Sequence, residues 1–204
     1  MLLFGHLGIT AGVFTAPALW AKNRGISLDP ETKPGLIGRI RNICFHLLNT
    51  INGEHRTIDC RLVFIGSMLP DIIDKPTWMF AFGDIFSTGR GYAHSFMFNI
   101  VLLLIALVLL RYRKSWLLVI SLSSFIHLVL DQIWNQPLTL WWPLGGPLPK
   151  VETTGWYSYL VEGLISSPSV YIPEIIGLMV LVLMGAKLVM KRRITHFFRT
   201  GLIE

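Results

Sequence analysis

Acidic and histidine side chains recur at helical spacing inside otherwise apolar stretches of this sequence. Asp71 and Asp74 are three residues apart, so a helix would place both carboxylates on one face. His127 and Asp131 are four residues apart near the end of another apolar run, and they also share a face. Acidic groups at membrane depth are disfavoured unless they pair, bind a cation or line a polar cavity. Because a cation would relieve the repulsion between the carboxylates, this pattern indicates a site for a divalent metal.

Further candidates lie near the ends of other apolar runs. His94 begins one such run, and the preceding Arg90 could hold a phosphate group with two parallel hydrogen bonds. His6 interrupts the first apolar run, where it could be either a ligand or a buried, hydrogen-bonded histidine. Glu174 is better explained as a carboxylate stabilised by a helix N-terminus. These residues extend the candidate metal set to His6, Asp71, Asp74, His94, His127 and Asp131, with Arg90 as the candidate catalytic residue.

Several of these residues have a structural alternative. His127 and Asp131 could satisfy each other across one helical turn. Asp74 could form a surface ion pair with the adjacent Lys75. Arg90 could belong to an ordinary basic loop. The metal hypothesis therefore depends on whether the chain brings these residues together.

The composition is that of a membrane protein. The 204 residues are 52% hydrophobic and 15% charged, and the mean hydropathy is +0.57, which lies outside the usual range of soluble domains. The net charge of +6 is better explained by basic loops that face the cytoplasmic leaflet than by nucleic-acid binding. Cys44 and Cys60 lack metal-site spacing, so we expect free thiols.

The hydrophobic pattern predicts an all-α, multi-pass transmembrane bundle in a single domain spanning residues 1–204. The predicted spans are five apolar segments, residues 2–20, 62–82, 96–110, 116–134 and 172–190. The first is expected to be retained and not cleaved as a signal. Pro70 and the two aspartates predict that the second span is short or kinked. Residues 37–48 predict an interfacial amphipathic helix, and residues 135–169 predict an ordered cap at the headgroup level.

The distribution of basic residues predicts the orientation of this bundle. With the N-terminus outside, every lysine and arginine except Lys75, Arg90 and Lys150 falls on the inner side, in agreement with the positive-inside rule. The same orientation places all the candidate ligands near the outer face. Their gathering at one depth is the main argument for a shared site.

The segments that carry these candidates also resemble a known family. Residues 66–71 (GSMLPD), 90–95 (RGYAHS), 127–131 (HLVLD) and 142–143 (WP) are similar to segments of the predicted membrane-bound metal-dependent hydrolases of bacteria and archaea. That family is distantly similar to zinc-dependent phospholipase C and P1 nuclease, which are all-helical. The resemblance implies metal roles for Asp71, His94, His127 and Asp131, with His6 as an addition. The chain lacks the later HxxxE ligand pair of the soluble enzymes.

These observations together predict a membrane-bound metal-dependent hydrolase of the inner membrane. One or two divalent metal ions, with zinc preferred, would activate water against a phosphoester, and Arg90 would steady the phosphate. A site at the outer leaflet favours a membrane lipid or lipid-linked substrate. One alternative is a transporter or ion-coupled membrane protein that uses the same Asp and His residues, and another is a non-catalytic membrane scaffold.

Overall fold

The computed structural model describes residues 3–23, 58–80, 89–148 and 156–203. Every secondary-structure element in these ranges is a helix, which confirms the all-helical prediction for the described part of the chain. The predicted interfacial helix at residues 37–48 lies outside the described residues. The elements are α1 (Leu3–Asn23), α3 (Cys60–Phe80), η1 (Tyr92–His94), α4 (Phe96–Arg111), α5 (Trp116–Leu130), η2 (Ile133–Asn135), α6 (Pro137–Leu140), α7 (Trp156–Ser166), α8 (Pro168–Met190) and α9 (Ile194–Thr200).

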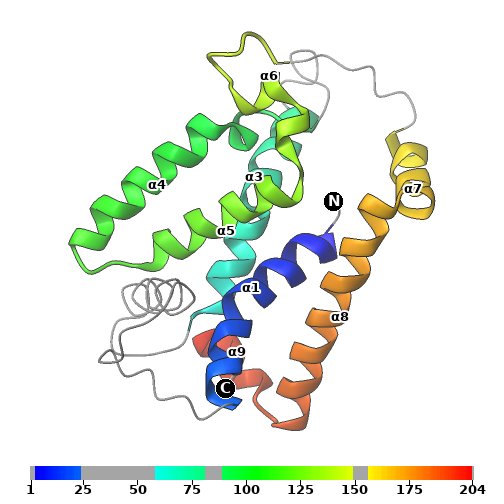
Figure 1. The fold of residues 1–204 in the computed structure, drawn as a ribbon. Helices are drawn as coiled ribbons and strands as arrows, with labels where there is room; N and C mark the ends of the chain where they lie inside the picture. The colour runs from blue at the N-terminus through cyan, green and yellow to red at the C-terminus, as the bar shows by residue number, and fades with distance from the viewer. Residues whose placement is uncertain (1–2, 24–57, 81–88, 149–155, 204) are drawn as a thin grey trace, which may run out of the picture.

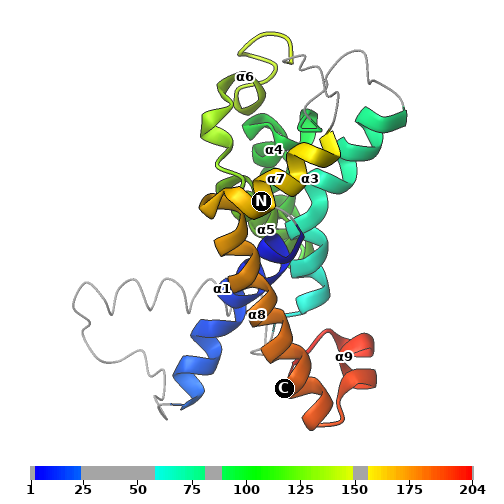
Figure 2. The same cartoon turned by 90° about the vertical axis from the view of Figure 1, so that its right-hand side faces the viewer.

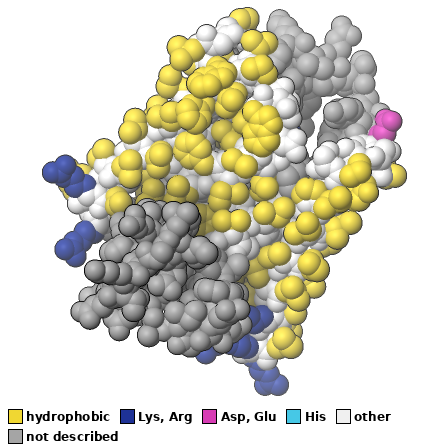
Figure 3. All heavy atoms as spheres, in the orientation of Figure 1, with side chains coloured by type: hydrophobic (Ala, Val, Ile, Leu, Met, Phe, Trp, Pro, Cys, Tyr) yellow, Lys and Arg dark blue, Asp and Glu magenta, His cyan; other side chains and the backbone are white. Residues whose placement is uncertain are grey.

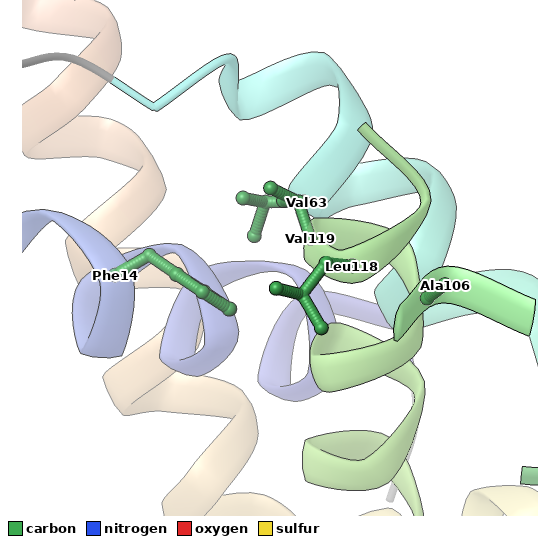
Figure 4. Packing of buried hydrophobic residues seen from close by; sticks show 5 residues of the cluster. All are labelled: Phe14, Val63, Ala106, Leu118 and Val119. Carbon is green, nitrogen blue, oxygen red and sulfur yellow. The ribbon is translucent and has the colours of Figure 1, made fainter. Parts of the chain in front are cut away.

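Helices α1, α3 and α5 form the centre of the structure. Helix α1 packs against α8 on one side and α3 on the other, while α5 packs against α3 and α4 (Figure 1). Helices α4 and α5 form the expected hairpin, whose tight turn contains Arg113 with a φ of 59°. The apolar core joins four helices through Phe14, Val63, Ala106, Leu118 and Val119 (Figure 4). Figure 2 shows that α6 and α9 lie at opposite ends of the molecule.

The surface and the interior have an arrangement typical of membrane proteins. Side chains of α4 and α8 expose large apolar groups, for example Val108 at 59% and Leu183 at 64%. Figure 3 shows this apolar surface, and the lysine and arginine side chains visible there lie at its edges. The interior instead contains many fully buried polar residues, among them Thr10, Ser67 and Asn99. Polar groups that face the inside of an apolar bundle are expected when the surroundings are lipid.

Only part of the predicted membrane arrangement can be read from helix length. Within the described residues, α8 is the one helix that is long and apolar enough to cross a membrane. Helices α4 and α5 are apolar but contain 16 and 15 residues, whereas a span needs about 20. The arrangement with five spans therefore stays a prediction.

Two helical segments differ from the prediction. Helix α3 continues through Pro70 and Pro76 for 21 residues, which is possible because neighbouring groups can satisfy the carbonyls that a proline leaves without a donor. The segment predicted as a cap contains the helix α7, and α8 begins at Pro168, four residues before the predicted start of the last span. Proline is favoured in the first helical turn, where its missing N–H has no helical partner in any case.

Candidate metal centre

Four segments bring the six candidate ligands together at one end of the bundle. His6 comes from α1, and His94 ends η1 immediately before α4. Asp71 and Asp74 come from α3, while α5 supplies His127 and ends at Leu130, so that Asp131 is its C-terminal cap. The imidazoles are fully buried and the carboxylates nearly so; the six residues are His6, Asp71, Asp74, His94, His127 and Asp131. The convergence predicted from depth in the bundle is thus present in the structure.

Asp74 fixes the orientation of His94. Its carboxylate accepts hydrogen bonds from the backbone N–H groups of Gly91 at 2.8 Å, Ala93 at 3.0 Å and His94 at 3.1 Å. His94 Nδ1 donates to the same carboxylate at 2.7 Å. These contacts hold the η1 loop against α3 and leave Nε2 of the neutral imidazole as an acceptor. Asp74 therefore supports His94 in this arrangement, and its predicted direct contact with a metal stays untested.

The orientation of His127 is fixed by a backbone carbonyl. His127 Nδ1 donates to Ser67 O at 2.6 Å. Pro70 lies in the next turn of α3, where it removes one N–H from the helical ladder and pushes the turn apart, so carbonyl groups there can bond outside the helix. With a proton on Nδ1, Nε2 of a neutral His127 is also an acceptor.

Acceptor atoms face one another at the centre of the cluster. His94 Nε2 lies 3.2 Å from His127 Nε2, 3.6 Å from Asp71 Oδ1 and 3.7 Å from Asp131 Oδ2. Ligand atoms of a tetrahedral zinc with bonds of about 2.1 Å are about 3.4 Å apart. The donor set and its spacing therefore fit a zinc-like ion, and a proton shared by the two imidazoles is the simplest alternative.

His6 adds a second group of ligands beside the first. Its ring stacks on His127 with the centroids 4.0 Å apart, and its Nε2 lies 3.2 Å from Asp131 Oδ1. The buried Nδ1 of His6 has no hydrogen-bond partner among the described residues. Two sets of three residues are close enough to hold an ion, and they share His127: the first is His6, His127 and Asp131, and the second is Asp71, His94 and His127.

Two basic side chains flank the cluster. Arg90 Nε donates to Asp131 Oδ2 at 2.7 Å, and Lys75 Nζ donates to Asp71 Oδ2 at 2.7 Å. The alternative that Lys75 pairs with Asp74 is therefore wrong. Lys75 lies four residues after Asp71, and residues four apart face each other on a helix whereas adjacent residues do not.

Glu174 lies outside the candidate ligand set and contacts the start of α1. Its Oε2 accepts a hydrogen bond from Phe4 N at 2.9 Å, in the first turn of α1. A carboxylate is favoured at a helix N-terminus, as expected, but the helix is α1 and not α8, to which Glu174 belongs. This contact fixes the start of α1, and thereby the position of His6 two residues later.

Asn99 supports the site from α4, and the sequence motifs did not identify it. Its Nδ2 donates to the carbonyls of Ala93 at 3.0 Å and Ser95 at 2.9 Å, while Ser124 Oγ donates to its Oδ1 at 2.6 Å. These bonds tie the η1 loop to α5. The signal was available, because Asn99 is an amide within the most apolar run of the chain.

Substitution of Asp74 by Asn should weaken metal binding without abolishing it. The amide can accept from fewer of the four donors, and it cannot stabilise the His94 ring as a carboxylate does. Loss of such an outer partner typically costs about 10- to 100-fold in metal affinity. Competition with a chromogenic chelator measures the affinity, and Glu162→Gln on the exposed face of α7 is the matched control. An unchanged affinity in Asp74→Asn would contradict the supporting role.

The comparisons with known proteins identify a family. Residues 1–195 match the family model described as YdjM inner membrane protein. No curated protein and no solved structure matches the chain.

Proposed function

The chain belongs to the YdjM inner membrane protein family and is a protein of the inner membrane, and from this premise and the buried cluster we propose that it is a metal-dependent hydrolase of phosphoesters. The buried histidines and aspartates could bind a metal ion. The reaction class is the part that we propose. It agrees with the hydrolase expected from the sequence resemblance.

One observation carries the proposal. His94 and His127 each have Nδ1 occupied by an acceptor, and their Nε2 atoms lie 3.2 Å apart with carboxylate oxygens around them, so that in two neutral rings the Nε2 lone pairs face each other. Such an arrangement repels itself unless a cation lies between the acceptors. Imidazole nitrogens and carboxylate oxygens are the ligands of catalytic zinc sites.

The neighbouring residues suit hydrolysis. Asp71, His94 and His127, with Asp131 beside them, would hold a zinc-like ion, which when bound would supply activation of water and polarisation of a phosphoryl oxygen. Arg90 lies beside Asp131 and is partly exposed, so it can bind the phosphate oxygens of a substrate at the edge of the cluster. In the reaction, the water oxygen bonds to phosphorus, the ester P–O bond breaks, and the alcohol leaves with a proton.

A second candidate function is ion-coupled transport, and a deeper set of polar residues favours it. Thr10 lies one helical turn beyond His6 on α1, and Ser123 lies one turn before His127 on α5. The hydroxyls of Thr10, Ser123 and Ser121 are buried without hydrogen-bond partners in the described part of the chain. Because α1 runs away from the cluster and α5 runs toward it, Thr10 and Ser123 both lie deeper than the cluster, where their hydroxyls could accept water or a cation.

Turnover and flux assays with the same variant distinguish the two functions. We expect the metal-loaded wild type in detergent to hydrolyse a chromogenic phosphoester, and Asp71→Asn to reduce kcat by at least about 100-fold because it removes one ligand charge from the cluster. Asp59→Asn, which changes a carboxylate paired with Arg61 far from the cluster, is the matched control. Metal-dependent ion uptake into proteoliposomes that Asp71→Asn abolishes, without any phosphoester turnover, would instead establish transport.

A further inference from the structure

We propose that the substrate is an anionic membrane phospholipid, whose phosphate binds between Lys75 and Arg90 and whose acyl chain lies in an apolar groove beside α4 and α5. This inference rests on the proposed hydrolase function. It gives Lys75 and the groove roles in substrate binding. Metal binding by the cluster does not require either of them.

Lys75 and Arg90 each pair with a different carboxylate of the cluster. Each donates at 2.7 Å to one carboxylate, Lys75 to Asp71 and Arg90 to Asp131. Both carboxylates lie within 3.7 Å of His94 Nε2. The side chains of Lys75 and Arg90 are 57% and 28% exposed, whereas the carboxylates are nearly buried. The two cations therefore border the cluster and are more accessible than the carboxylates that they bind.

The charge of the cluster predicts what the two cations bind once a metal is present. The cluster contains three carboxylates, those of Asp71, Asp74 and Asp131, and two cations flank it, so with neutral imidazoles the site has an excess of one negative charge. One divalent ion reverses that sign. The carboxylates that then bind the ion interact less with Lys75 and Arg90, whose N–H groups are the natural donors to the oxygens of a phosphate. A metal-loaded site of this kind favours an anionic substrate.

The apolar groove consists of two pockets that share Phe96, Leu140 and Trp141. It is lined by aromatic and aliphatic side chains from the start of α4, the end of α5 and α6, among them Phe96, Phe125, Leu128, Trp134, Leu140 and Trp141. Phe96 and Trp141 pack edge to face, with the ring centroids 5.8 Å apart. The only residue between Phe96 and His94 is Ser95, which caps α4. One wall of the groove is therefore two residues along the chain from a candidate metal ligand.

The occupant of the groove follows from its surroundings. The groove is continuous with the apolar exposed face of α4, and an inner membrane surrounds such a face with acyl chains. Tyr92, in the same turn as His94, packs on Trp142 at 4.7 Å and so joins the cluster side to the groove side. A lipid that places its phosphate at the two cations can therefore place its chain in the groove.

Binding of non-hydrolysable ligands tests the two halves of the site separately. We would titrate metal-loaded protein in detergent by calorimetry with three short-chain ligands: a glycerol phosphonate, its dihexanoyl ester, and uncharged dihexanoylglycerol. We expect the dihexanoyl phosphonate to bind at least tenfold more tightly than either of the other two. Lys75→Gln should weaken both phosphonates by about 10-fold, because a hydrogen bond to a charged group is lost. Trp141→Ser should weaken only the acylated ligands, by about 5-fold, because apolar contact is lost.

Two control variants and a metal assay make the outcomes decisive. Lys191→Gln removes a positive charge at the far end of α8, and Val182→Ala shortens an exposed apolar side chain on α8; neither should change any affinity. If the wild type binds metal and hydrolyses phosphoesters but Lys75→Gln binds the phosphonates normally, the headgroup assignment is wrong while the proposed function stands. Equal affinity for the acylated and unacylated phosphonates would show a soluble phosphoester site and would overturn the lipid assignment. A wild type without metal overturns the proposed function itself.

Discussion

Purified wild-type protein is expected to contain at least one equivalent of a divalent transition metal, and His127→Ala is expected to lose it. His127 belongs to both groups of three residues that could hold an ion, and its Nε2 is oriented toward the cluster by the bond from Nδ1 to Ser67 O. Loss of a direct ligand should exceed the roughly 10- to 100-fold loss of affinity that follows removal of an outer partner. Elemental analysis of both proteins after identical purification measures the difference.

A matched histidine control excludes a general effect of the substitution. His196 lies on the exposed face of α9, far along the chain from the cluster, so His196→Ala should keep the full metal content. Helix content by circular dichroism should be the same for both variants and for the wild type. Metal-free, fully helical wild type would remove the metal hypothesis and leave the shared-proton alternative at His94 and His127. Equal metal content in His127→Ala and the wild type would show that the ion binds elsewhere.

The proximity of the candidate residues could be predicted because it follows from their positions along the helices and from the hairpin of α4 and α5. Asp71 lies on the second half of α3, and the α4–α5 hairpin returns His127 and Asp131 to the same end as His94. A tight turn between two apolar runs requires that their far ends meet. Depth in the bundle was therefore enough to predict proximity, although it could not give the distances between the atoms.

The partners of individual carboxylates could be predicted only where the contact is local. The pair of Asp71 with Lys75 follows from helical spacing alone, since residues four apart face each other. The contacts of Asp74 depend on how the η1 loop folds back on α3, and the contact of Glu174 with Phe4 joins residues 170 positions apart. No periodicity within one element specifies such contacts.

Substitution of Gly177 by Ala is expected to destabilise the protein strongly through the contact between α1 and α8. A Cβ atom at Gly177 would lie 2.1 Å from Phe4 O, and one at Gly8 would lie 2.0 Å from Gly177 O. Both obstacles are backbone atoms, which cannot rotate away as a side chain can, so the two helices must separate. Overpacking in a close contact costs about 3 kcal/mol of the free energy of unfolding. Thermal unfolding in detergent, monitored by circular dichroism, measures the loss.

A second glycine of the same helix provides the control. A Cβ atom at Gly185 would have no other described atom within 4 Å, so Gly185→Ala meets open space. Alanine also favours the helical state over glycine by about 1 kcal/mol, which should keep or raise the unfolding temperature. A similar decrease in both variants would show that a general effect of alanine in α8, and not the contact with α1, determines the stability.

Gly177→Ala should also lower the metal affinity, because it displaces α1. Gly177 lies three residues after Glu174, whose carboxylate holds Phe4 N, so displacement of α1 from α8 also moves His6 away from His127 and Asp131. The group of Asp71, His94 and His127 does not include any residue of α1. We therefore expect Gly177→Ala to lose metal affinity by about as much as His6→Ala does, and the double variant to lose little more, because both changes remove the same ligand. Independent, additive losses in the double variant would show that α1 supports the cluster by means other than His6.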